Sequence, residues 1–357
     1  MISYPSTEQF RHVIASVTRH TRRREEDRDK ELPVLKFIGT VKLHGTNSAI
    51  VYQKDKGHWC QSRNNIITPQ KDNAGFAAHI DPLADQFFAE RVLAQSPAIQ
   101  EQYEQGRKIV IFGEWCGGNI QKGVAISGLP KMFVIFKVRV RVEVEAKAEA
   151  AAAAAATTDD QEDEFDSKYS FWLDPKDWSH LRWPEKSIYN IYDFPTYEID
   201  IDFQSPKLVQ NKLVEITQQV ERECPVGAHF NQKGIGEGVV WTEWAQSRGG
   251  LTFKVKGEEH SVSKVKTLAP VDAEKLSSIQ EFVDYACTEN RLRQGLEYLR
   301  EQQLTIEMKN VGAFLKWIVA DIIKEEKDTM DESNIIPKDI THAVSGKAKT
   351  WFQVQLS

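Results

Sequence analysis

The sequence predicts an α+β protein, in which antiparallel sheets with flanking helices are followed by a smaller all-α region. Two observations support this prediction. Short β-rich runs separated by Gly, Asn and Pro fill residues 36–140, whereas beyond Pro270 the apolar residues recur at helical spacing. The chain has 357 residues, of which 41% are hydrophobic, so it is long enough for two or three domains.

Individual elements follow from the same patterns. An amphipathic helix capped by Ser6 or Thr7 is expected where apolar residues recur at i, i+3, i+4 and i+7, at Phe10, Val13, Ile14 and Val17. Strands are expected at Lys36–Leu43, Ala49–Gln53, Lys108–Trp115, Met132–Val140, Gly238–Thr242 and Leu251–Lys256. Two C-terminal helices are indicated, one by Leu292, Leu296 and Leu299, and the other by Leu315, Ile318, Val319 and Ile322.

Charge is distributed unevenly along the chain. The net charge is -6, but residues 143–166 alone contain nine acidic residues and one lysine, so the rest of the chain is mildly basic. The run at 145–156 is rich in alanine, and the acidic stretch after it cannot bury a core. We interpret 143–167 as a flexible insertion in a first domain at 1–268, which is followed by a helical domain at 270–357.

Apolar runs and the start of the chain indicate where the protein is located. No run approaches the roughly 20 apolar residues of a membrane span, and the chain does not begin with the apolar core of a secretory signal. We therefore expect an intracellular protein, cytoplasmic or nuclear, and a monomer. The arginine-rich run Arg19–Arg24 also permits a mitochondrial presequence. The four cysteines are isolated and form no CxxC pair, so we expect buried thiols.

The most informative segment is Lys42-Leu43-His44-Gly45-Thr46-Asn47, where a strand ends in a glycine turn. Further short motifs follow it in order: Ser62-Arg63-Asn64, Phe112-Gly113-Glu114, Ile135-Phe136, Glu237-Gly238-Val239-Val240 and Lys254-Val255-Lys256. Together they resemble the six ordered motifs of the covalent nucleotidyltransferases, which include DNA ligases, RNA ligases and mRNA-capping enzymes. The string KxHGTN is similar to the RNA ligase 2 branch, which includes phage RNA ligase 2 and kinetoplastid RNA-editing ligases. The implied fold is an adenylyltransferase domain.

The chemistry itself also favours these residue types. A lysine that attacks a phosphate must be deprotonated, although its ordinary pKa is about 10.4, so it needs cationic neighbours. Alternation along Leu251–Lys256 places Lys254 and Lys256 on one face of a strand, about 7 Å apart. Two such cations can also offset the charge that builds up on a phosphate during transfer.

The resemblance implies a role for each matching residue. Lys42 would be the nucleophile that takes AMP, with Lys254 and Lys256 as the other catalytic residues. Glu237 would position Mg²⁺ or Mn²⁺, and Glu114 would bind the ribose. The remaining nucleotide contacts would come from Arg63, His44, Asn47 and the stacking aromatic Phe136. The family often has an acidic residue after that aromatic, but Lys137 stands here, so Phe133 remains an alternative.

The implied activity is that of an ATP-dependent RNA ligase, which joins RNA 5′-phosphate and 3′-hydroxyl ends through lysyl-AMP and RNA-adenylate intermediates. Two alternatives are a capping-type guanylyltransferase that uses GTP and a non-catalytic RNA-end-binding protein. We expect the helical region 270–357 to help bind RNA, and Lys207, Lys212, Lys264 and Lys266 could line the RNA backbone. Trp172, Trp178 and Trp183 could stack on bases, but packing of a long connection onto the domain is the favoured interpretation.

Overall fold

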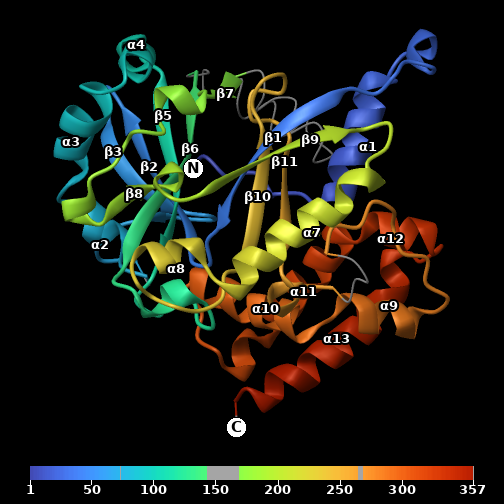
Figure 1. Ribbon diagram of the computed structural model, residues 1–357. Helices are drawn as coiled ribbons and strands as arrows, with labels where there is room; N and C mark the ends of the chain where they lie inside the picture. Colours follow the sequence, from blue (N-terminus) through green and yellow to red (C-terminus); the bar gives the residue numbers. More distant parts are fainter. Residues whose placement is uncertain (73, 143–168, 264–267, 357) are drawn as a thin grey trace.

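The structure is a computed structural model that describes residues 1–72, 74–142, 169–263 and 268–356. The expected insertion 143–167, Lys264 and Lys266 therefore lie outside the described residues. All of the motif positions lie within them. Two β-sheets lie side by side, and the C-terminal helices cover one end of both (Figure 1). The described chain thus has the α+β architecture with a C-terminal helical region that the sequence predicts.

The first sheet has four strands, and every neighbouring pair is antiparallel. Its order is β11-β10-β1-β9, with β1 at Val34–Lys42, β9 at Thr196–Asp202, β10 at Gly238–Glu243 and β11 at Thr252–Lys256. Alternation along β1 buries Leu35, Phe37 and Val41 in the core and turns Lys42 to the opposite face. One face of the sheet is therefore apolar, and the other is free to carry polar side chains.

Two helices pack on the apolar face of this sheet: α1 at Phe10–Thr21 and α7 at Lys207–Arg222. Phe10, Val13 and Val17 are buried there, which confirms the predicted amphipathic helix. The predicted cap is wrong. The residue before α1 is Gln9, and its side chain makes no capping hydrogen bond. Apolar burial instead stabilises the start of the helix, because Phe10 packs against Phe253 of β11.

The second sheet has seven strands. They are β2 at Thr46–Gln53, β3 at Gly57–Ser62, β4 at Ile66–Ile67, β5 at Lys108–Cys116, β6 at Met132–Arg141, β7 at Ser170–Trp172 and β8 at Ile188–Asn190. Their pairs are antiparallel except β6 with β8, which is parallel. Short helices cover its outer face: α2 at Phe76–Ile80, α3 at Ala84–Phe87 and α4 at Pro97–Glu104 (Figure 1). The six predicted strands all form, although β2 begins at Thr46 rather than Ala49.

The C-terminal helices enclose a hydrophobic cluster of their own. They are α9 at Ile279–Ala286, α10 at Glu289–Glu301, α11 at Val311–Glu325, α12 at Lys327–Glu332 and α13 at Pro337–Val354, and a short α8 at Pro225–His229 precedes them. Both predicted C-terminal helices are confirmed as α10 and α11. Within the described residues, no helix is both long and apolar enough to cross a membrane.

Candidate active site

Glu237 is the centre of the candidate site. It directly precedes β10, its side chain is 2% exposed, and each of its two oxygens binds a lysine. Oε2 lies 2.7 Å from Lys42 Nζ, and Oε1 lies 3.0 Å from Lys256 Nζ. His44 Nδ1 lies 3.3 Å from Oε2. The structure therefore brings together four of the predicted site residues, which come from three separate motifs.

The pairing of strands explains this meeting. Lys42 is the last residue of β1, and its Cα lies opposite Gly238 of β10, which in turn lies opposite Lys256 of β11. Gly238 has a φ of +150°, and a Cβ at this position would clash with the carbonyl of Val255. Because no side chain intervenes at Gly238, Lys42 and Lys256 can approach Glu237 from the two flanking strands.

Burial and neighbouring charges shift the pKa values in this cluster. Burial lowers the pKa of Lys42, and the charge of Lys256 lowers it further, while Glu237 opposes the shift. For Glu237, burial raises the pKa, but Lys42 and Lys256 outweigh it and hold the pKa well below its usual range. Glu237 therefore stays ionised, and Lys42 loses its proton more readily than an ordinary lysine.

Glu114 lies on β5 beside the glycine turn that follows Lys42. Its Oε1 accepts a hydrogen bond of 2.9 Å from the backbone N–H of Gly45. A Cβ on Gly45 would clash with the carbonyl of Trp115, so glycine lets the turn approach β5 closely. Burial is the main reason that the pKa of Glu114 rises to about 7, while the charge of Lys42 lowers it.

Three other predicted residues lie further from Glu237. Asn47 is half-buried on β2, directly opposite Glu114 in the strand pairing. Arg63 is exposed after β3, and its Nη2 donates to Ser6 Oγ at 3.4 Å. Lys254 lies on the same face of β11 as Lys256, as the alternation predicts, but its Nζ binds Glu325 Oε1 of α11 at 2.7 Å.

The two candidate aromatic residues occupy different environments. Phe133 is fully buried in the core beneath the second sheet, where its ring centroid lies 4.9 Å from that of Phe76. Phe136 is only half-buried, and its ring lies 5.1 Å from that of Tyr4. Lys137 is buried, donates to the carbonyl of Gly249 at 2.7 Å and therefore ties the second sheet to the first. Of the two rings, Phe136 has the surface needed to contact a nucleotide.

The structure adds residues that lie outside the motifs. The His260 ring lies 5.4 Å from that of His44, and burial lowers its pKa to about 4. Three carboxylates of the helical region interact with the site cations: Glu325 in direct contact with Lys254, and Glu297 and Glu301 electrostatically at longer range. No local pattern in the sequence distinguishes them from ordinary surface glutamates. Trp178 and Trp183 are buried, which confirms the expectation that they pack.

Comparisons with known proteins agree with the motifs. A family model described as RNA ligase matches residues 35–266. No curated protein matches the chain. Solved structures of Naegleria gruberi RNA ligase variants are similar to it: one with AMP and Mn at 16% identity and a TM-score of 0.40, and an apo form at 15% identity and 0.41. Each match covers 72% of this chain and 56% of the other, so the chain spans just over half the length of those proteins.

Because these TM-scores are below 0.5, the family to which the chain belongs is shown by the family model and not by the solved structures. That match covers more than half of the 357 residues and contains every predicted site residue from Lys42 to Lys256. The chain belongs to the RNA ligase family.

Proposed function

We propose that this protein is an ATP-dependent RNA ligase that joins RNA 5′-phosphate and 3′-hydroxyl ends through lysyl-AMP and RNA-adenylate intermediates. The observation that carries the proposal is the cluster of Lys42, Lys256 and Glu237, in which burial and a second cation lower the pKa of Lys42. A module that only binds RNA has no need of an activated amine beside a buried carboxylate. The match to the RNA ligase family supports the same reading.

The first proposed step is transfer of AMP to the protein. Neutral Lys42 Nζ forms a bond to the α-phosphorus of ATP, while the bond from that phosphorus to the bridging oxygen breaks and pyrophosphate leaves. The amine loses a proton, which passes to solvent. Lys256 is placed to offset the negative charge on the phosphate, because its ammonium group lies at the same carboxylate as Lys42 Nζ.

Two further transfers complete the proposed reaction. An oxygen of the RNA 5′-phosphate attacks the phosphorus of lysyl-AMP, the N–P bond breaks, and Lys42 regains a proton. The 3′-hydroxyl oxygen of the other end then attacks the 5′-phosphorus, its proton is lost, and AMP leaves. All three steps are in-line displacements at phosphorus, so one set of charged residues can serve each of them.

The remaining roles rest on the resemblance of the motifs to those of the covalent nucleotidyltransferases. We propose that Glu114 binds the ribose and that Phe136 stacks on adenine. Arg63 would lie near the ribose and phosphate, and His44 and Asn47 would lie around the phosphates and the metal. Within the described residues, no three His, Cys, Asp or Glu side chains form a metal site. A site with the single carboxylate of Glu237 still suits Mg²⁺, because this ion commonly binds one or two carboxylates together with substrate phosphates and waters. Glu237 would hold it, and the ion would offset phosphate charge.

Labelling with radioactive nucleotide tests the proposal. Purified protein is incubated with Mg²⁺ and α-labelled ATP or GTP and separated by denaturing electrophoresis, with Lys42→Ala in parallel. We expect label from ATP on the wild-type protein and none on Lys42→Ala. Label from GTP would instead favour a capping-type enzyme, and no label from either would favour an RNA-end-binding protein.

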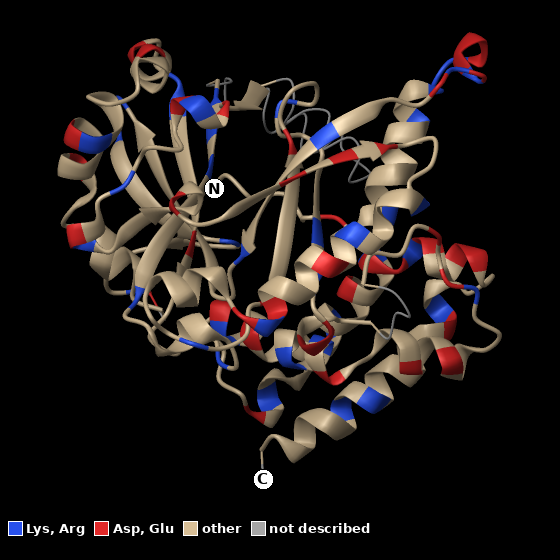
Figure 2. Cartoon of the chain, viewed as in Figure 1, with Lys and Arg blue, Asp and Glu red and all other residues tan. Residues whose placement is uncertain are grey.

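We also propose that the helical region at 270–357 contributes to RNA binding, through its outer rather than its inner surface. Lys338 and Lys349 are exposed on α13, and Figure 2 shows basic positions along this helix. Lysines on an exposed helix bind RNA phosphates without reading sequence. The double variant Lys338→Glu/Lys349→Glu should therefore weaken RNA sealing at physiological salt and leave labelling by ATP unchanged. Equal sealing by the variant and the wild type would contradict this assignment.

A further inference from the structure

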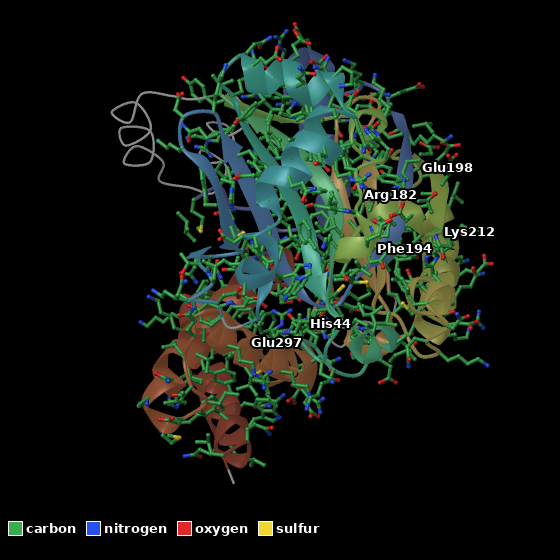
Figure 3. All side chains as sticks on the ribbon, turned by 90° about the vertical axis from the view of Figure 1, so that its left-hand side faces the viewer. His44, Arg182, Phe194, Glu198, Lys212 and Glu297 are labelled. Atoms are coloured by element: carbon green, nitrogen blue, oxygen red, sulfur yellow. The ribbon has the colours of Figure 1, made fainter. Side chains whose placement is uncertain are left out.

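The helical region turns an acidic surface toward the candidate site. Glu297 and Glu301 lie on α10, and Asp321 and Glu325 lie on α11. Glu325 Oε1 binds Lys254 Nζ at 2.7 Å, and Glu301 Oε1 accepts a hydrogen bond from Thr46 Oγ1 at 3.5 Å. In Figure 3, Glu297 lies beside His44 at the junction of α10 and the sheets. We name these four carboxylates the acidic cover.

The acidic cover faces cations that the proposed reaction needs for phosphates. Glu297 interacts with His44 and Lys256 through space, and Glu301 interacts with Arg63. Burial raises the pKa of both Glu297 and Glu301, and Glu297 also raises that of Glu301, so the two carboxylates repel each other. Burying carboxylates that repel each other lowers the free energy of unfolding, and the same charges would repel a triphosphate.

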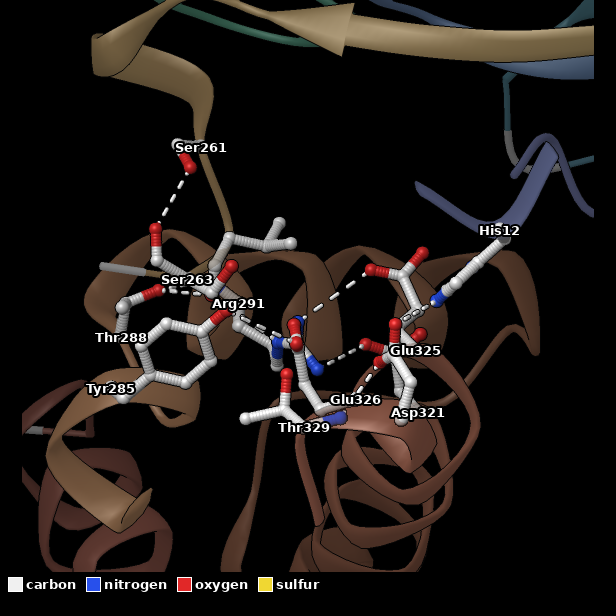
Figure 4. Close-up of polar contacts among 12 residues, drawn as sticks. His12, Ser261, Ser263, Tyr285, Thr288, Arg291, Asp321, Glu325, Glu326 and Thr329 are labelled. Atoms are coloured by element: carbon white, nitrogen blue, oxygen red, sulfur yellow. Dashed lines mark hydrogen bonds and ion pairs between the residues drawn. The ribbon is translucent and has the colours of Figure 1, made fainter. Parts of the chain in front are cut away.

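One buried arginine, Arg291, holds two members of the acidic cover, Asp321 and Glu325, in place (Figure 4). Arg291 of α10 is fully buried and binds Asp321 at 3.3 Å, Glu325 at 3.5 Å and Glu326 at 3.0 Å. Arg11 of α1 binds Glu326 at 2.8 Å, which ties the helical region to the first sheet. Arg291 thus keeps Glu325 ionised and aimed at Lys254, whether or not a substrate competes for that lysine.

A plain domain interface would explain the contacts of Arg11 with Glu326. It does not explain why the partly exposed Glu325 pairs with a lysine of the proposed phosphate site, or why further carboxylates surround the same cations. We propose that the acidic cover is an autoinhibitory contact, in which Glu325 occupies Lys254 in place of the phosphates of ATP and must be displaced when ATP binds. The inference rests on the proposed function.

Kinetics of labelling provide the first test. Glu325→Gln, in the full chain, removes the competing charge and leaves Arg291 paired with Asp321 and Glu326. We expect the ATP concentration for half-maximal labelling to fall roughly 5-fold, at the low end of coupling between two sites. The matched control is Glu332→Gln, which removes an equal charge from an exposed position on α12 and should change nothing.

Cross-linking of the wild-type protein provides a second test that does not depend on any variant folding. A zero-length carbodiimide should couple Lys254 to Glu325, which are 2.7 Å apart, and peptide mass spectrometry detects the product. We expect this cross-link in the protein alone and its loss when ATP is added. If label forms but the cross-link persists with ATP and Glu325→Gln leaves the half-maximal concentration unchanged, the autoinhibitory role is wrong. If no label forms from ATP, the proposed function itself fails.

Discussion

Replacing Lys256 with methionine should shift the pH dependence of protein adenylylation to higher pH. Lys42 and Lys256 bind the two oxygens of one carboxylate, at 2.7 and 3.0 Å. Two like charges roughly 5 Å apart, at an effective dielectric constant of about 20, repel by roughly 3 kcal/mol, or about 2 pKa units. Because only the neutral amine attacks, the labelling rate near neutral pH should fall about 100-fold through this effect alone.

The assay is the single-turnover rate of label transfer from ATP, measured from mildly acidic to alkaline pH. Methionine keeps the apolar stem of the lysine, so the strand should pack as before. Lys212→Met on the exposed surface of α7 is the control and should behave like the wild type. Glu237→Gln should shift the profile the opposite way, because Glu237 raises the pKa of Lys42. A Lys256→Met rate that falls by the same factor at every pH would refute the reasoning.

Two further predictions follow from burial. The pKa of Glu114 is raised to about 7 from 4.5, so the folded protein keeps a proton that the unfolded chain releases, and the free energy of unfolding falls as pH rises between these values. Glu114→Gln should remove roughly 3 kcal/mol of that pH dependence, as measured by urea unfolding at the two ends of this range. Phe133→Ala should lose about 3–5 kcal/mol of stability, as expected for a core aromatic. Phe136→Ala should lose less and instead raise the ATP concentration needed for labelling; equal stability losses would contradict the assignment of Phe136.

Much of the first sheet could be predicted from sequence because its strands have clear period-2 burial. Alternation along β1 and β11 correctly places Lys42, Lys254 and Lys256 on the polar face. β3 and β9 are among the strands that are not predicted. β3 has only two apolar residues, Trp59 and Cys60, which are adjacent and give no alternation. β9 does alternate, with Ile199 and Ile201 buried between acidic residues, but its high acidic content hides that pattern. The parallel pairing of β8 with β6 depends on a chain reversal that no local pattern encodes.

The candidate site could be predicted where its residues belong to motifs, and only there. The order of the motifs predicts that Lys42, Glu237 and Lys256 share one site. The register of β1, β10 and β11 explains why they meet. His260 and Glu297 reach the site from segments that look like ordinary surface. The position of Glu297 depends on how α10 packs against the sheets, and that of His260 on the turn of the chain after β11. Both are properties of tertiary structure and not of spacing along the chain.

The partners of the three site lysines also show which counter-charge a substrate can replace. Glu237 neutralises Lys42 and Lys256 and is 2% exposed beside the strand that carries Lys42, so displacing it would disturb the first sheet. Glu325 neutralises Lys254 from a helix outside that sheet and is 21% exposed. A triphosphate can offer Lys254 a stronger negative charge than one carboxylate. Substrate binding should therefore displace Glu325 from Lys254 and leave Glu237 in its position beside β10.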